Sequence, residues 1–234
     1  MPLQNGGVLV MRKIIITILI LFPCFVQSQT IMRFEESGVP SGTTGAFSTW
    51  TNTASAIFRR AHATGFKQST TIASTTLAVD NSSGTATTCF GQFISPYLTA
   101  QTISGTITGY ARMSIANVTG ATVQSRVKVT VINQAGTVVA TLVALTAGAS
   151  NLTTTLTSYQ ILNAAAISSY TCANGDRLCI EIGIGRSAGT TARNGTVSFG
   201  TSSATDITAA GSTTANNPVL TFSGNLSFYK GAIF

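Results

Sequence analysis

Apolar and polar residues alternate along several windows of this chain, and this period of two is the feature that most restricts its fold. Valines occupy positions 123, 127, 129 and 131, with polar residues between them. The window from Arg177 to Gly183 places Leu178, Ile180 and Ile182 on the predicted buried side, with Arg177, Cys179 and Glu181 pointing away. A period of two with one wet face indicates half-buried antiparallel strands.

At least nine such strands are expected along the chain. They lie near residues 30–35, 71–77, 88–94, 103–113, 123–131, 137–145, 177–183, 194–200 and 218–228. Only Ala54–Phe66 and Leu162–Ser169 favour a short helical turn, and turn-forming clusters such as Asp80–Gly84 separate the strands. The pattern predicts a single all-β domain over residues 29–234, an antiparallel jelly-roll-like β-sandwich.

The surface of this domain must be covered mainly by neutral polar side chains. Charged residues make up 8% of the chain, whereas there are 39 Thr and 24 Ser. Ordinary globular domains carry about 25% charged residues. The content of β-branched and aromatic residues argues against a disordered chain. The basic residues are scattered without interleaved aromatic residues, which argues against a nucleic-acid partner.

The N-terminal region predicts export. The basic Arg12 and Lys13 precede an apolar run from Ile14 to Phe22, and Val26-Gln27-Ser28 is a small-residue cleavage pattern. We expect a signal peptide over residues 1–28, with Met11 as an alternative start and lipidation of Cys24 as the second reading. The run is too short to span a bilayer, which takes about 20 residues. Cleavage removes Arg12 and Lys13 and lowers the net charge from +7 to +5, leaving a secreted or cell-surface protein with no membrane span.

Three cysteines follow the predicted cleavage site, in a compartment that permits disulfides. Cys172 and Cys179 could form a disulfide if the loop between them is wider than a two-residue turn, and Cys89 could compete for either partner. Small buried thiols are an equally good interpretation. With His62 far from any cysteine pair, the spacing does not favour a zinc site.

The same loop contains a structural turn, Asn174-Gly175-Asp176, in which Asp176 can accept backbone N–H groups. Calcium binding by Asp176 and Glu181 is the weaker alternative, because no acidic calcium loop is present. Two further features argue against an enzyme: the chain lacks a G-x-S-x-G motif, and the neighbours Glu35 and Glu36 point to opposite faces if extended. We expect no cofactor.

Aromatic side chains are the candidate ligand-binding groups. Trp50, Tyr97 and Tyr110 could stack on sugar rings if they shared one exposed face. Further tyrosines at 159, 170 and 229 could join them. In the competing interpretation, Trp50 and most tyrosines fill the edges of the sandwich with their polar tips outward.

Three blocks of sequence resemble a known β-sandwich module. They are residues 93–106 (FISPYLTAQTISGT), residues 175–183 (GDRLCIEIG) and residues 217–223 (NPVLTFS), in that order. The module is similar to jelly-roll-like domains of phage virion and tail-associated proteins and of uncharacterised environmental surface proteins. The resemblance implies the fold and no shared catalytic residues. This chain departs from it in Val219, where an aromatic residue is usual, and in its signal peptide.

These observations favour a secreted, non-enzymatic structural or adhesive protein of a bacterial surface or extracellular assembly. Its expected partners are further copies of itself or another surface protein. A carbohydrate-binding module is the alternative, and a virion-associated fibre or decoration protein is a third reading. We also expect Thr30–Phe34 to form a strand, either in its own sheet, which we favour, or on the sheet edge of a neighbouring subunit.

Overall fold

The computed structural model describes residues 29–34, 50, 52–53, 58–63, 73–78, 87–189, 194–199 and 205–229. The predicted signal peptide and the Asp80–Gly84 turn lie outside these residues. The strands are β1 (Thr30–Phe34), β2 (Asn52–Thr53), β3 (Phe58–Ala63), β4 (Ala73–Ala78), β5 (Thr87–Ile94), β6 (Gln101–Ile103), β7 (Thr106–Ile115), β8 (Ala121–Ile132), β9 (Val138–Asn151), β10 (Thr157–Ala166), β11 (Tyr170–Cys172), β12 (Arg177–Gly189), β13 (Asn194–Phe199) and β14 (Val219–Phe222). No helix in the described ranges is long and apolar enough to cross a membrane.

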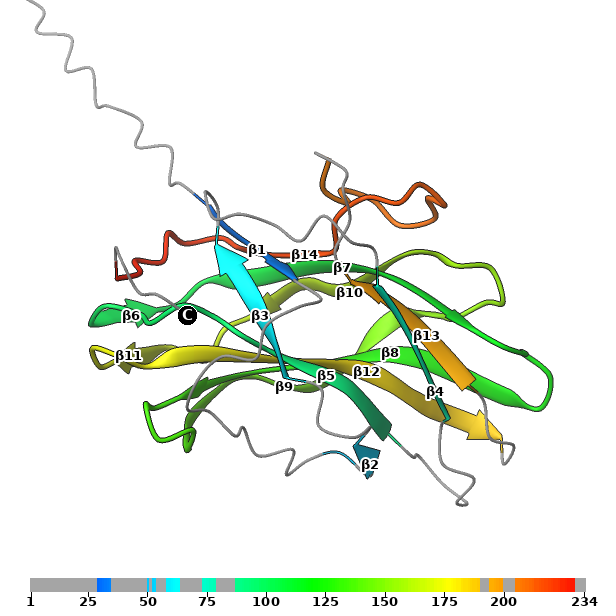
Figure 1. The fold of residues 1–234 in the computed structure, drawn as a ribbon, viewed down its shortest axis with the longest axis horizontal. Helices are drawn as coiled ribbons and strands as arrows, with labels where there is room; N and C mark the ends of the chain where they lie inside the picture. The colour runs from blue at the N-terminus through cyan, green and yellow to red at the C-terminus, as the bar shows by residue number, and fades with distance from the viewer. Residues whose placement is uncertain are drawn as a thin grey trace, which may run out of the picture.

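The strands form a β-sandwich, which confirms the predicted all-β class. One layer contains β10, β7, β14 and β1, and the other contains β5, β12, β8 and β9 (Figure 1). Strand β3 connects the layers, because it pairs with β1 on one side and with β5 on the other. Strands β6 and β11 form a separate ribbon at one end. Most of the strand pairs are antiparallel, as predicted, whereas β2 and β3 both run parallel to β5.

Strand β1 is inserted within its own sheet. It pairs with β14 through Thr30 opposite Phe222 and with β3 through Phe34 opposite Ala61. Arg33 adds a two-pronged ion pair to Asp206, with N–O distances of 2.8 and 2.6 Å. The favoured prediction for the N-terminal strand is therefore confirmed.

The described residues of the two segments expected to contain a helical turn form no such turn. Residues 58–63 form β3, which is held by pairing with strands distant in sequence. Such tertiary pairing overrides weak local preference. Residues 157–166 form β10, whose pairing with β7 shifts register twice, after Gln160 and after Leu162. Ala164 within this irregular part has φ of 43°. The bulges break the alternation that would otherwise have identified a strand.

The core lies between the two layers, and β12 is buried on both faces. Its inward side chains Leu178, Ile180 and Ile182 pack in the main core, as predicted. The prediction that Arg177, Cys179 and Glu181 point into solvent was wrong, because each is 1% exposed. The outward side chains of β12 from Arg177 to Arg186 are therefore buried as well. The alternation of residue type in β12 therefore separates a polar buried face from an apolar buried face, and does not separate an exposed face from a buried one.

Candidate functional site

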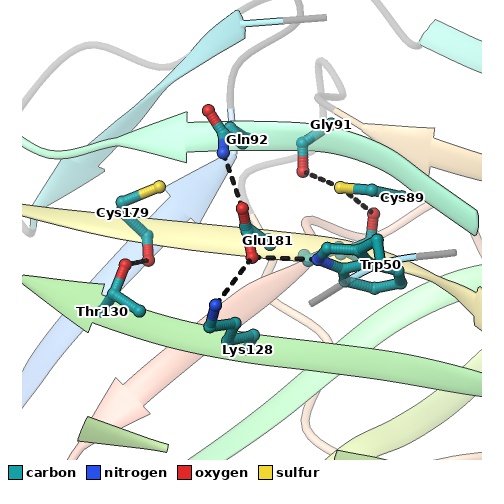
Figure 2. Close-up of polar contacts among 9 residues, drawn as sticks. Trp50, Cys89, Gly91, Gln92, Lys128, Thr130, Cys179 and Glu181 are labelled. Atoms are coloured by element: carbon teal, nitrogen blue, oxygen red, sulfur yellow. Dashed lines mark hydrogen bonds and ion pairs between the residues drawn. The ribbon is translucent and has the colours of Figure 1, made fainter. Parts of the chain in front are cut away.

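The outer face of β12 carries a group of buried polar side chains. We call Trp50, Gln92, Lys128 and Glu181 the Glu181 cluster (Figure 2). The carboxylate of Glu181 accepts a hydrogen bond from Trp50 Nε1 at 2.9 Å and one from Gln92 Nε2 at 2.6 Å. Lys128 Nζ lies 3.9 Å from Glu181 Oε2. All four side chains are buried.

Strand register places three of these side chains in a row. Glu181 of β12 is the direct partner of Gln92 on β5 and of Lys128 on β8. Directly opposed residues project to the same face of a sheet. The fourth member, Trp50, comes from the segment before β2, and its ring packs against Gly183, where an added Cβ would lie 2.7 Å from Trp50 Cζ3. The absence of a side chain at Gly183 therefore makes room for the Thr88 carbonyl oxygen on β5, with which an added Cβ would clash, and for the indole.

Two thiols lie beside the cluster, and a third lies elsewhere. Cys89 contacts the carbonyl oxygens of Gly91 and Ile182 at 3.5 and 3.7 Å, while the backbone carbonyl of Cys179 accepts a bond from Thr130. Burial, followed by the nearby negative charge of Glu181, raises the pKa of both Cys89 and Cys179. These thiols are therefore protonated at neutral pH and are poor nucleophiles.

The disulfide considered for Cys172 and Cys179 is not formed, and Cys89 is a free thiol too. Cys172 belongs to the main core between the layers, whereas Cys179 packs with Ile94 and Ile132 in a separate cluster. Cys172 ends β11 and Cys179 is in β12, so the two cysteines lie in different packing environments. All three behave as small buried side chains, which was the other interpretation of the sequence.

The arrangement around Glu181 fixes strands to one another. Its two oxygens are engaged by donors from β5, from the Trp50 segment and from β8. A buried carboxylate is costly unless it is paired and hydrogen-bonded, and here both conditions are met. Within the described residues, no three His, Cys, Asp or Glu side chains gather as a metal-binding group would.

The predicted turn forms a compact structure directly before the first residue of β12. Gly175 has φ of 90°, a conformation that favours glycine, and its N–H donates to Leu98 O at 3.0 Å. Asp176 Oδ2 accepts the N–H of Ala173 at 2.8 Å, and Asn174 Oδ1 accepts that of Ala100 at 2.7 Å. The turn is thereby tied to the chain that follows β5.

The structure does not bring Trp50, Tyr97 and Tyr110 together. Trp50 lies in the Glu181 cluster and is 8% exposed. Tyr110 is half-buried on β7 in the opposite layer, with its hydroxyl 3.3 Å from Gln160 Nε2. Tyr97 is half-buried after β5, with the guanidinium carbon of Arg177 4.2 Å from its ring centroid. These three side chains therefore lie in three different surroundings in this structure.

Sequence reasoning missed a further surface feature. All 47 residues from Val129 to Gly175 lack Asp, Glu, Lys, Arg and His, and this stretch includes β9 and β10. Most of β9 is exposed or half-exposed, including Val139 at 40%. The run of uncharged residues was visible in the sequence, but only the structure shows that it forms a surface.

Comparisons with known proteins found viral structures of low similarity and no related curated sequence. No family model matches the chain, and no curated protein matches its sequence. The structure of infectious bursal disease virus Gt strain aligns over 83% of this chain and 59% of its own, with 11% identity and a TM-score of 0.25. The VP2 subviral particle of infectious bursal disease virus aligns over 83% and 62%, with 15% identity and a TM-score of 0.24.

This chain thus spans about three fifths of the length of those viral proteins. TM-scores at this level do not establish a common fold, so the description of a β-sandwich depends on the strand pairing alone. The resemblance to a phage-associated module stays a prediction.

Proposed function

We propose that this protein is a non-enzymatic structural or adhesive component of an extracellular assembly, acting through contacts of its sandwich surface with further copies of itself. The uncharged surface of β9 and β10 carries the proposal. Exposed strands of monomeric proteins are commonly protected from association by charged side chains, especially Lys. The exposed positions of β9 are occupied instead by Ala, Thr, Val, Ser and Asn.

The remaining features are consistent with this role. The buried Glu181 cluster and the Arg33–Asp206 pair hold the layers and the N-terminal strand together. The predicted signal peptide supports a location outside the cell. A rigid, weakly charged sandwich suits repeated packing against identical copies, because little charge has to be desolvated at such a contact.

The test introduces charge into this surface. Thr141 and Ala144 are exposed on β9, and the double variant Thr141→Lys/Ala144→Lys is expected to shift the mature protein toward monomers. Sedimentation velocity over a range of concentrations measures the change, and electron microscopy shows whether fibres or lattices disappear. The matched control, Thr208→Lys/Ala210→Lys, adds the same charge at exposed positions outside β9 and β10.

Assembly that weakens only in the β9 variant supports the proposal. A wild-type protein that remains monomeric at high concentration contradicts it, as does equal weakening by both pairs of lysines, which would indicate a net-charge effect.

A further inference from the structure

Two segments far apart in sequence pair at the end of the sandwich that carries β6 and β11. Leu98 and Phe228 form an antiparallel bridge, Thr99 N donates to Ser227 O at 3.1 Å, and Tyr229 N donates to Tyr97 O at 3.0 Å. We call residues 97–101 and 225–229 the tyrosine ribbon. In Figure 1 the stretch after β14 runs back to this end of the molecule.

The pairing determines which side chains share a face of the ribbon. Leu98 is fully buried and Phe228 packs against the main core. Because successive side chains of an extended segment alternate between faces, Tyr97 and Tyr229 both project outward. They are opposite each other, a relation that places Cβ atoms about 4.5–5.5 Å apart. Tyr229 is 40% exposed and Tyr97 is half-buried, so both tyrosine side chains are accessible on the outer face of the ribbon.

Arg177 supports the inner side of this pair. Its guanidinium carbon lies 4.2 Å from the Tyr97 ring centroid, and its Nε donates to Ser95 O at 2.9 Å. Since Arg177 is 1% exposed, the accessible part of the Tyr97 ring is on the side away from it. The contact holds the ring in place before any ligand arrives, which lowers the entropic cost of binding.

Neutral hydrogen-bonding groups continue from the tyrosines along the ribbon. Gln101 Nε2 donates to Ser227 O at 2.7 Å, and its Oε1 accepts the Ser227 N–H at 2.9 Å. Beyond them lies a hollow of about 340 Å³, lined by hydroxyl and amide side chains together with glycine: Thr102, Ser104, Ser223 and Asn225 among them. Neither segment of the ribbon contains a charged residue.

We propose that the tyrosine ribbon is a binding site for neutral hexopyranose units of a glycan. The apolar C–H face of a pyranose stacks on the exposed part of the Tyr229 or Tyr97 ring, and hydroxyl groups of the sugar or its neighbour reach the hollow around Ser223. Ligand sites combine apolar surface with a few placed polar groups, and tyrosine supplies both at low cost in conformational entropy. A ligand with a formal charge would find no counter-charge on the ribbon. The inference goes beyond the proposed function, which depends on a different surface.

The experiment uses the mature protein and two neutral probes, cellohexaose and laminarihexaose, titrated by isothermal calorimetry. We expect binding of at least one probe, weakened about tenfold or more by Tyr229→Ala and by Tyr97→Ala, since each removes one of the two aromatic rings on the outer face of the ribbon. Tyr229→Phe keeps the ring and is expected to bind within a few-fold of wild type. Val118→Ala, at a residue 52% exposed outside the ribbon, is the matched control and leaves affinity unchanged.

Circular dichroism of each variant establishes that it is folded, and Tyr229→Ala carries the decision if Tyr97→Ala destabilises the fold through Arg177. The proposal is overturned if neither oligosaccharide binds the wild type, or if folded Tyr229→Ala binds as tightly as the wild type does. Preference for a sialylated oligosaccharide over both neutral probes would also overturn it. Self-association is measured separately, so failure here leaves the β9 proposal standing.

Discussion

Replacing Glu181 by Gln tests whether the buried cluster holds the outer face of the sandwich together. The substitution keeps the size of the side chain but removes the charge that faces Lys128 at 3.9 Å. At that distance, with an effective dielectric constant of about 20, the lost attraction is about 4 kcal/mol. Breaking a buried pair by neutralising one partner typically costs about 3–5 kcal/mol, because the other charge stays buried. We therefore expect a loss of about 3–5 kcal/mol in the free energy of unfolding.

Urea unfolding followed by circular dichroism measures this loss, and the fluorescence of Trp50, the only tryptophan in the chain, reports on the cluster itself. The same measurement is made on Lys128→Gln and on the double variant Glu181→Gln/Lys128→Gln, in which neither charge of the pair remains. The double variant is expected to be more stable than the sum of the two single losses implies, by at least 2 kcal/mol or so. Additive losses, or a loss below about 1 kcal/mol in Glu181→Gln, would refute the assignment of a coupled buried pair.

Three further predictions concern neighbouring features. Gly183→Ala adds a Cβ that would clash with the Thr88 carbonyl oxygen and lie 2.7 Å from Trp50 Cζ3, so we expect a loss of about 1–3 kcal/mol in thermal unfolding. A red shift of Trp50 emission is expected from the second contact, and unchanged emission would contradict the packing of the indole. Burial raises the pKa of Cys179, so the folded state favours the neutral thiol. The contribution of this thiol to the free energy of unfolding is complete below the unfolded pKa of about 8.5 and declines as the pH rises above that value. Cys179→Ala should therefore lose stability less steeply than wild type between about pH 8 and 10. Arg33→Ala removes the two-pronged contact to Asp206 and is expected to lower the free energy of unfolding in urea by about 1–3 kcal/mol. An unfolding midpoint equal to that of wild type would show that strand pairing alone holds β1 in place.

Strand positions could be predicted where alternation is regular. The windows around Val127 and Ile180 identified β8 and β12, and the extended N-terminal segment identified β1. Strand β10 was missed because two shifts of register disturb its pattern. Strand β3 was missed because its identity depends on partners in two different layers. Local sequence cannot show such pairing, since the stabilising contacts come from residues distant along the chain.

The candidate sites show the same limit. Asp176 and Gly175 could be placed in a turn because their residue types act through the local backbone. Glu181 was assigned to the wet face because a charged residue in an alternating strand is usually exposed. Its burial depends on Gln92 and Lys128 lying in register on both neighbouring strands. Tyr97 was proposed from its aromatic character, but its opposition to Tyr229 follows only from the return of the C-terminal segment.

The pairing of β1 with β14 has a consequence for how this molecule reaches its native state. Thr30 lies opposite Phe222, so two segments nearly the length of the chain apart must meet before the first layer is complete. Closing so long a loop costs entropy before the contact repays it, and proteins rich in such distant pairings fold slowly. Strand β1 also supports β3, which joins the layers. The sandwich therefore cannot be completed progressively from the N-terminus, and its assembly waits until residues 219–222 have been synthesised.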